Sequence, residues 1–161
     1  MHGAGRARIR HGDGAVMQLR ADLDGLTEPV SRRLLVSTRA SLLELHLVVQ
    51  RSFGRPEAEV HHFDIDGIRF HDPGARDDPS HGTDRNDLRS AGLHAGARFV
   101  HEADSGDGAW RHILTVEQVS PRLVGQRLPV CLDGIGASPP EDCENAARYQ
   151  ALLDALAAPL D

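Results

Sequence analysis

Two stretches of the sequence hold side chains that could carry out chemistry. Residues 104–112 include two aspartates, a tryptophan and a histidine, and residues 129–143 include two cysteines and two adjacent carboxylates. Thiols, imidazoles and carboxylates ligate metals, act as nucleophiles or bind polar ligands. If the two stretches meet at one edge of the fold, they form one candidate site, whose members are Asp104, Asp107, Trp110, His112, Cys131, Glu141, Asp142 and Cys143.

A first interpretation of these residues is structural. Aspartates in a glycine-rich turn satisfy turn amides, and Glu141 or Asp142 can cap the last predicted helix. Trp110 would then pack between the hairpin and that helix, and the two cysteines would be small buried apolar residues. On this interpretation the residues maintain the fold and bind no ligand.

A second interpretation is a binding site. A few polar groups that converge beside an aromatic wall are typical of a small-molecule pocket. His112 and the carboxylates would then surround Trp110 and contact a small molecule or a partner protein. No cofactor is expected on this interpretation.

A third interpretation is a metal-dependent or thiol-dependent centre. His112, Cys131 and Cys143 could hold zinc, although the sequence lacks the Cys-x-x-Cys and His-Glu-x-x-His spacings of common zinc sites. A nucleophilic thiol needs a partner that stabilises its thiolate, and His112 is the partner that the hairpin offers. Cys143 would also lie in the first turn of a helix, where the helix dipole lowers a thiol pKa.

The composition limits the class of protein. A chain of 161 residues, 40% of them apolar and 26% charged, is typical of one globular domain. The net charge is −6, and all 18 basic residues are arginine because the sequence has no lysine. Since an acidic chain lacks the field that attracts nucleic acid, duplex binding is not expected.

The sequence also bears on location. No apolar run reaches the roughly 18 residues of a membrane span, and the N-terminal residues lack the apolar segment of a secretory signal. The two cysteines do not form a disulfide framework, so we expect reduced thiols, with one disulfide or a shared metal as alternatives. We therefore expect a cytoplasmic protein without a membrane partner. The sequence does not specify a ligand or an oligomeric state.

The first elements are expected to be an arm and two strands. Residues 1–15 lack apolar periodicity and are expected to form a disordered arm. Residues 17–23 alternate apolar and polar side chains, which predicts a strand with one buried face. Residues 33–37 are expected to be the antiparallel partner of this strand, after a turn at Asp24-Gly25.

A helix is expected to begin after Ser41. Ser41 and Glu44 have the Ser-x-x-Glu form of a capping box. An apolar stripe at helical spacing follows and ends at Gly54; its members are Leu42, Leu45, Val49 and Phe53. His46 lies beside this stripe and is expected to be a structural histidine that is bonded to the backbone.

The middle of the chain predicts two hairpins. Residues 61–65 and 68–70 flank Asp66-Gly67, a strong two-residue turn signal, and residues 98–103 and 111–117 flank a turn rich in aspartate and glycine. Residues 84–93 are expected to form a short helix with Leu88 and Leu93 inward.

The C-terminal part predicts a loop and a final helix. Residues 120–128 are expected to be a loop. Residues 138–141 repeat the capping-box form, so the last helix is expected to start there and to run to about Ala158. Its apolar stripe is expected to dock on the sheet; the stripe comprises Tyr149, Leu152, Leu153 and Leu156.

Taken together, these residues resemble the plasmid pRiA-type ORF-three-like family, whose members are also labelled insertion-element passenger proteins with a TnpR-like name. The resemblance extends from about Val16 to the C-terminus, and residues 129–143 are its most specific part. Its pieces are Pro29, Arg32-Arg33, Leu42, Leu45-His46, Phe53-Gly54, His61, Phe63, Gly96, Phe99, Asp104, Gly106-Asp107, Trp110, His112, Pro129, Cys131, Gly134, Ala137, Pro139-Pro140-Glu141-Asp142-Cys143 and Tyr149.

The resemblance implies an α+β fold similar to a β-grasp, with a mixed sheet that holds one long helix and with a C-terminal helix. Residues 16–161 would form its single domain. Because the family is largely uncharacterised, the resemblance implies a binding or interaction module without an established catalytic activity. The alternative is a small metal-dependent or thiol-dependent enzyme, with its site between residues 104–112 and 131–143. The sequence lacks the nucleophile region of a serine recombinase, so the TnpR-like name implies no resolvase activity here.

The chain departs from the family pattern at several aromatic positions. The family usually has aromatic residues in its Asp-x-Gly-Asp turn, where this chain has Ala103 and Ser105. It favours tryptophan where this chain has Ser31 and Arg55. The chain is therefore expected to be a divergent member, with a smaller aromatic surface.

Overall fold

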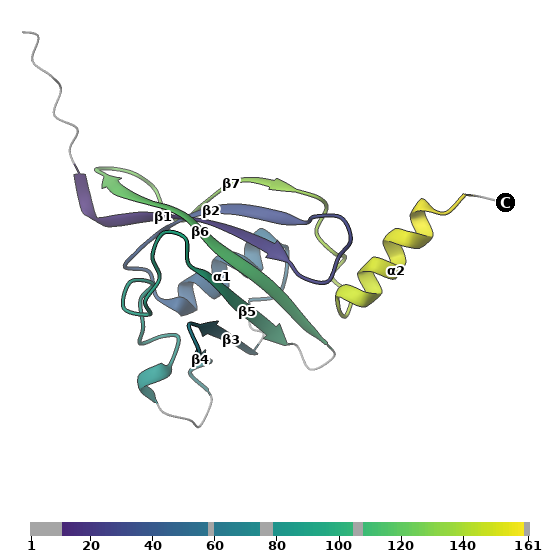
Figure 1. Ribbon diagram of the computed structural model, residues 1–161, viewed down its shortest axis with the longest axis horizontal. Coiled ribbons are helices and arrows are strands. Elements are labelled where there is room, and N and C mark those ends of the chain that lie inside the picture. Colours follow the sequence, from purple (N-terminus) through teal and green to yellow (C-terminus); the bar gives the residue numbers. More distant parts are fainter. Residues whose placement is uncertain (1–10, 58–59, 75–78, 105–107, 160–161) are drawn as a thin grey trace, which may run out of the picture.

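Strands of alternating apolar and polar residues build one sheet in the computed structural model, which describes residues 11–57, 60–74, 79–104 and 108–159. Helix α1 packs against one face of this sheet, and helix α2 extends beyond it (Figure 1). The strands are β1 (His11–Leu23), β2 (Ser31–Ser37), β3 (Val60–Ile65), β4 (Ile68–His71), β5 (Arg98–Asp104), β6 (Ala109–Leu123) and β7 (Val130–Ile135). The helices are α1 (Leu42–Ser52), the short 3₁₀ helix η1 (Pro79–His81) and α2 (Ala146–Ala157).

The strand order of the sheet is β4-β3-β5-β6-β1-β2-β7. Every ladder between these described strands is antiparallel. The predicted α+β class is confirmed, but the expected mixed sheet is corrected to an antiparallel one, and the β-grasp label is not confirmed. The physical reason is that neighbouring strands run in opposite directions along the whole order, including the pairs β1–β6 and β2–β7, whose members are far apart in the sequence.

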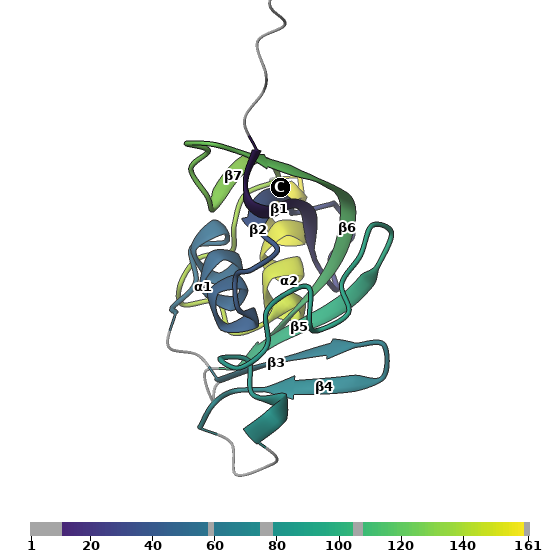
Figure 2. The same ribbon diagram turned by 90° about the vertical axis from the view of Figure 1, so that its left-hand side faces the viewer.

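Two strands form the centre of the sheet. β6 pairs with β1 on one side and with β5 on the other, and Figure 2 shows its long curved path. Four buried side chains of β6 alternate with exposed or partly buried ones: Trp110, His112, Leu114 and Val116. β1 begins at His11 and β6 ends at Leu123, so both strands are longer than expected. Residues 11–15, which were expected in the arm, belong to β1, and His11 and Ala15 pair with β6 on either side of an irregularity.

Helix α1 begins where its capping box predicted. The Ser41 Oγ accepts from the Glu44 N–H at 3.0 Å, and the Glu44 carboxylate accepts from the Ser41 N–H at 3.0 Å. These two bonds satisfy amides that a helix start otherwise leaves unpaired. The predicted stripe is buried against the sheet, which confirms the register of the helix; its members are Leu42, Leu45, Val49 and Phe53.

The predicted helix over residues 84–93 is wrong, because these residues form turns. Their backbone groups bond to the segment before α1: the Leu88 N–H donates to the Ala40 carbonyl, and the Leu42 N–H donates to the Asn86 carbonyl. Asp87 and Ser90 also bond to each other through side chain and backbone. Asparagine, aspartate and serine compete in this way with helical hydrogen bonds. Leu88 is buried as predicted.

The second predicted capping box is also wrong. Residues 138–141 are not helical, and α2 begins at Ala146, where Asn145 is the N-cap residue and its side chain accepts from the Arg148 N–H at 2.9 Å. The Ser138 hydroxyl instead accepts from the Arg32 guanidinium at 2.7 Å. Ser138 therefore bonds to Arg32 on the distant strand β2 and does not cap the helix that the local sequence predicted.

Arg32 fastens β2 to two other parts of the chain. Its guanidinium donates to the Ser52 carbonyl at the end of α1 and to the Ile135 and Gly136 carbonyls after β7. It also lies over the Phe53 ring, 5.1 Å from the ring centroid. Charge-assisted hydrogen bonds of this kind are stronger than those between neutral groups.

Helix α2 docks only by its first turns. The Tyr149 side chain is buried, and its hydroxyl donates to the Ala137 carbonyl at 2.7 Å. Leu153 packs partly against the core, whereas Leu152 is 40% and Leu156 is 74% exposed. The predicted docking of the whole stripe is therefore correct only for its N-terminal half, because the helix extends away from the sheet (Figure 1).

Within the described residues, the structure has no helix that is both long and apolar enough to cross a membrane.

Replacement of Arg32 by alanine is expected to destabilise the fold strongly. The substitution leaves several carbonyls without their donor, and each lost hydrogen bond to a charged group costs about 1.5–3 kcal/mol. We expect a clear drop in the urea midpoint. Arg33→Ala is the matched control, since its partners Glu117 and Asp133 lie at the surface and stay hydrated. Equal losses for both variants would contradict the assigned role of Arg32.

Candidate functional site

Four histidines lie inside the core, with exposed fractions of 3% or less: His46, His61, His101 and His112. His61, His101 and His112 occupy inward positions on three neighbouring strands, β3, β5 and β6, and His46 comes from α1 above them. His101 and His112 are directly opposite each other in the β5–β6 ladder. Histidine is seldom fully buried, so four together need an explanation.

Hydrogen bonds link three of these imidazoles into a chain. The His46 Nε2 lies 3.0 Å from the Glu57 carbonyl oxygen, and the His46 Nδ1 lies 2.8 Å from the His101 Nε2. The His101 Nδ1 lies 3.0 Å from the His112 Nδ1. The ring of His61 stacks on that of His46 at 3.8 Å. His46 therefore bonds to the backbone as predicted, but it also begins a chain that the sequence did not reveal.

The Glu57 carbonyl sets the direction of this chain. A carbonyl can only accept, so His46 carries its hydrogen on Nε2, and in the neutral ring its Nδ1 accepts. His101 must then donate from Nε2 and accept at Nδ1, and His112 must donate from Nδ1. The His112 Nε2 is left with a lone pair, and it has no hydrogen-bond partner within the described chain.

Burial keeps these imidazoles neutral. The pKa of His112 is lowered to about 3, mainly by desolvation and to a smaller extent by the positive charge of the nearby Arg55. Desolvation is also the main cause that lowers the pKa of His101 and the pKa of His46. Removal from water penalises the charged imidazolium, and neighbouring positive charge adds to the penalty.

Arg55 joins the end of the chain to the C-terminal segment. Its guanidinium lies 5.0 Å from the centroid of the Trp110 ring, a cation–π contact, and donates to the Glu141 carbonyl at 3.5 Å. Gly108, at the start of β6, approaches the Glu144 backbone so closely that a Cβ on this glycine would collide with it. The start of β6 and the segment that contains Glu141 are therefore neighbours.

The structure thus brings together part of the predicted site. Trp110 and His112 are buried side by side on β6, and the Glu141 backbone reaches them through Arg55. The carboxylates of Glu141 and Asp142 belong to exposed residues. Asp104 ends β5 as an exposed residue, and Asp107 lies outside the described residues.

Cys131 lies far from this group. It is exposed on β7 and pairs with Leu34, which is level with Leu19 and Val116 across the sheet. Three strand spacings of about 4.8 Å separate β7 from β6, and His112 lies a further four residues along β6. Cys131 and His112 are therefore too far apart to bind one metal ion.

Cys143 occupies a third environment. It precedes α2 instead of lying in its first turn, it is half-buried, and its Sγ lies 3.7 Å from the Asn145 carbonyl oxygen. Both cysteines are free thiols. Across the described residues, no group of three or more histidine, cysteine, aspartate and glutamate side chains has the arrangement of a metal site. Zinc binding stays a prediction that elemental analysis of the purified protein can test.

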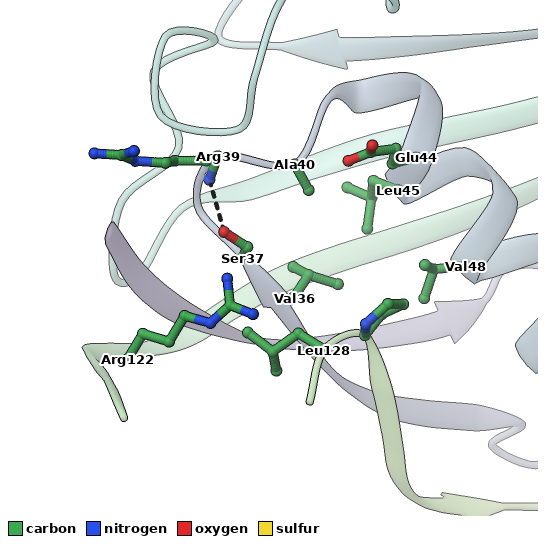
Figure 3. Close-up of a pocket in the computed structure, with 10 residues that line it drawn as sticks. Val36, Ser37, Arg39, Ala40, Glu44, Leu45, Val48, Arg122 and Leu128 are labelled. Carbon is green, nitrogen blue, oxygen red and sulfur yellow. Dashed lines mark hydrogen bonds between the residues drawn. The ribbon is translucent and has the colours of Figure 1, made fainter. Parts of the chain in front are cut away.

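A cavity of about 280 Å³ opens on the side of the molecule where α1 meets β2 (Figure 3). Its walls are mostly apolar and come from β2, α1, the end of β6 and the loop before β7, whereas its rim has two arginines, one glutamate and one serine. The lining residues are Val36, Ser37, Arg39, Ala40, Glu44, Leu45, Val48, Arg122, Leu128 and Pro129. The sequence prediction included none of them.

A second, wider cavity of about 490 Å³ lies beside the start of β1. Its polar lining residues include Arg89 and His94, and its apolar wall includes the exposed Val119. Both cavities have fully buried side chains in their lining, Val36 and Leu45 in the first and Met17 in the second. The first cavity is the better candidate because three charged side chains line it, against one in the second, and charged groups at a rim can orient a ligand.

One sequence signal could have found the histidine chain. The period-two pattern that predicts β3, β5 and β6 places His61, His101 and His112 on the same face as their buried neighbours. The cavity has no such signal, because its walls come from four separate segments whose proximity depends on the sheet order.

The fold and these sites define an α+β protein with a one-layer antiparallel sheet, a covering helix and an apolar surface cavity. The family model of the plasmid pRiA4b ORF-3-like protein matches residues 15–161, so the chain belongs to this family. The chain is also similar to the crystal structure of a protein of unknown function from Methanosarcina mazei Go1, with 25% identity and a TM-score of 0.77. The match covers 91% of this chain and 84% of that one. No curated protein sequence matches significantly.

The buried histidines are expected to make stability depend on pH. Their folded pKa values lie below the unfolded value of about 6.5, so the unfolded chain binds protons that the folded chain does not. Above the unfolded pKa the histidines do not affect the free energy of unfolding. As the pH falls below it, they lower the free energy of unfolding by about 1.4 kcal/mol per pH unit for each proton that only the unfolded chain binds. His101 and His112 alone give an expected slope of about 2–3 kcal/mol per pH unit in urea unfolding between pH 6 and 5, and the lowered pKa of His46 adds to it.

Histidine NMR spectra provide the control for this slope. The ring signals of His101 and His112 should stay constant from pH 8 to 5, because both rings stay neutral in the folded protein. Normal titration of His101 and His112 in the folded protein would contradict the neutral chain.

The two thiols are expected to react at different rates with iodoacetamide at neutral pH. Cys131 is exposed on an edge strand and Cys143 is half-buried, so Cys131 should react faster than Cys143 because the reagent reaches it more easily. Mass spectrometry of partly labelled protein measures both rates. A rate for either thiol far above that of a model thiol would favour the thiol-dependent enzyme.

Proposed function

We propose that the protein is a small-molecule binding module and that the cavity between α1, β2 and the loop before β7 is its binding site. The observation that carries this proposal is the composition of the cavity: an apolar floor with a few polar groups at its rim. Most small-molecule sites have this composition.

The scaffold of the cavity is fixed by local structure. The capping box holds the first turn of α1, which contributes Glu44 and Leu45. Val36 is held within the β1–β2 ladder, and β7 pairs with β2 directly after Pro129. A site whose walls are set before binding loses little conformational entropy when a ligand enters.

The volume indicates how much of a ligand the cavity can enclose. A water molecule occupies about 30 Å³ of the liquid, so a cavity of 280 Å³ holds roughly nine such volumes. A small ligand of about six to ten non-hydrogen atoms therefore fits inside it.

The region around Trp110 and His112 is a less direct candidate for a ligand site. Two atoms there, the Trp110 Nε1 and the His112 Nε2, have no hydrogen-bond partner among the described residues, and both are buried away from solvent. A ligand could reach them only if part of the surrounding structure moved. The enzyme alternative likewise stays a prediction, with thiol labelling and elemental analysis as its tests.

Hexanol is a suitable first probe, because it has the size of the cavity and no charge. Burial of five or six methylene and methyl groups at about 0.8 kcal/mol each corresponds to a dissociation constant on the order of 1 mM. We expect NMR titration to shift the signals of Ala40, Leu45, Val48 and Leu128. Unchanged signals for these residues at saturating hexanol would contradict the proposal.

Val48→Trp is the matching variant. Val48 lines the cavity and is only partly buried, so a larger side chain can fill the space without disrupting the core. We expect at least a tenfold loss of hexanol affinity, with little change in the urea midpoint. Ile68→Trp, on the exposed edge strand β4, is the control and should bind hexanol like the original protein.

A further inference from the structure

We infer that the ligand of this cavity is an amphipathic molecule with one acidic head group, which Arg122 and Ser37 bind, and with a short apolar body. This inference rests on the proposed function and names its ligand class. Carboxylates and phosphate monoesters share the required head-group chemistry, since both present oxygen atoms with negative charge to a guanidinium.

Arg122 is a positioned cation at the rim. One of its terminal nitrogens donates to the Gln126 carbonyl at 3.2 Å. Gln126 itself is fixed by a turn, because its backbone N–H donates to the Leu123 carbonyl and its side chain accepts from the Leu123 N–H. The guanidinium thus has a set orientation before a ligand arrives.

Neither rim arginine has an acidic partner among the described residues. In Figure 3 the side chain of Arg39 extends away from the cavity, whereas the guanidinium of Arg122 lies between Ser37 and Leu128. Arg122 is therefore the arginine that meets a ligand, and Arg39 adds positive charge nearby. In this acidic protein, an arginine without an acidic partner among the described residues is a local site for an anion.

Ser37 supplies a second donor. Its oxygen accepts from the Arg39 N–H at 3.2 Å, which leaves its hydroxyl hydrogen without an acceptor in the described chain. Figure 3 shows the Arg122 guanidinium beside the Ser37 side chain. An oxyanion at this point accepts from both groups, and each bond to the charged guanidinium is stronger than a neutral one.

The acidic residue of the rim does not oppose this arrangement. The Glu44 carboxylate accepts from the Ser41 N–H and belongs to the capping box of α1. Figure 3 shows it on the other side of the opening from Arg122, beside Leu45. An acidic head at Arg122 therefore lies away from Glu44, while a basic head would face the guanidinium and be repelled.

The apolar floor of the cavity determines the polarity of the other half of the ligand. Val36, Leu45, Val48, Leu128 and Pro129 offer no hydrogen bonds from their side chains. Any polar group placed there would lose its bonds to water without replacement. With the volume of about 280 Å³, this favours an alkyl or small ring body of about five to eight carbon atoms.

A series of hexyl compounds with different head groups tests the inference. Dissociation constants of hexanoate, hexyl phosphate, hexanol and hexylammonium are measured by NMR titration at pH 7.5 and low salt. We expect hexanoate or hexyl phosphate to bind roughly tenfold or more tightly than hexanol, since one charge-assisted bond is worth that factor. Hexylammonium should bind more weakly than hexanol. The better of the two anions identifies the source of the head group.

Two variants test the contact with the head group and the contact with the apolar body separately. Arg122→Gln should reduce the affinity for the anions to that for hexanol and leave hexanol unchanged, whereas Val48→Trp should weaken all four compounds. Arg98→Gln, an exposed arginine on β5 that does not line the cavity, is the charge-matched control and should preserve the advantage of the anions.

The outcomes distinguish the two proposals. Equal binding of hexanol and both anions overturns the acidic head group but leaves the binding module intact. No binding of any compound overturns both. An anion advantage that survives Arg122→Gln assigns the head group to another residue and contradicts the role of Arg122.

Discussion

The hydrogen bonds among buried imidazoles are the interaction on which the rest of the structure depends. Each imidazole that leaves water must satisfy both of its ring nitrogens inside the protein, or the fold loses the hydration energy of that group. The chain from the Glu57 carbonyl through His46, His101 and His112 satisfies all of these nitrogens except the last. It requires α1, β5 and β6 to hold one relative position, since bonds of 2.8–3.0 Å tolerate little displacement.

A second set of polar contacts fixes the other side of the sheet. Arg32 ties β2 to the end of α1 and to the chain after β7, and the Tyr149 hydroxyl ties α2 to the same segment. Because the edge strand β7 is exposed along its whole length, its apolar contacts alone would hold it weakly. The cavity lies between these two regions, with walls from α1 and β2 and from the loop that enters β7. Its shape is therefore a consequence of both sets of contacts.

The candidate site shows where reasoning from sequence succeeds and where it does not. Trp110 and His112 were singled out by type and spacing, and the structure places them together with the Glu141 backbone. Cys131 was grouped with them because it is close in sequence to Cys143, but the two belong to different elements and Cys131 lies on the far edge strand. Spacing along the chain could not predict this, since the strand order places β1 and β2 between β6 and β7.

The sequence by itself determined the elements whose signals are local. Alternation defined the central strands, Asp66-Gly67 defined the β3–β4 hairpin, and the Ser41 capping box defined the start of α1, because each signal acts between residues a few positions apart. Only the tertiary structure decided the antiparallel order, the strand β7, the fate of Ser138 and the contacts among the histidines. In each of these a polar group found a partner far along the chain, as Ser138 did with Arg32, and no local pattern encodes such a partner.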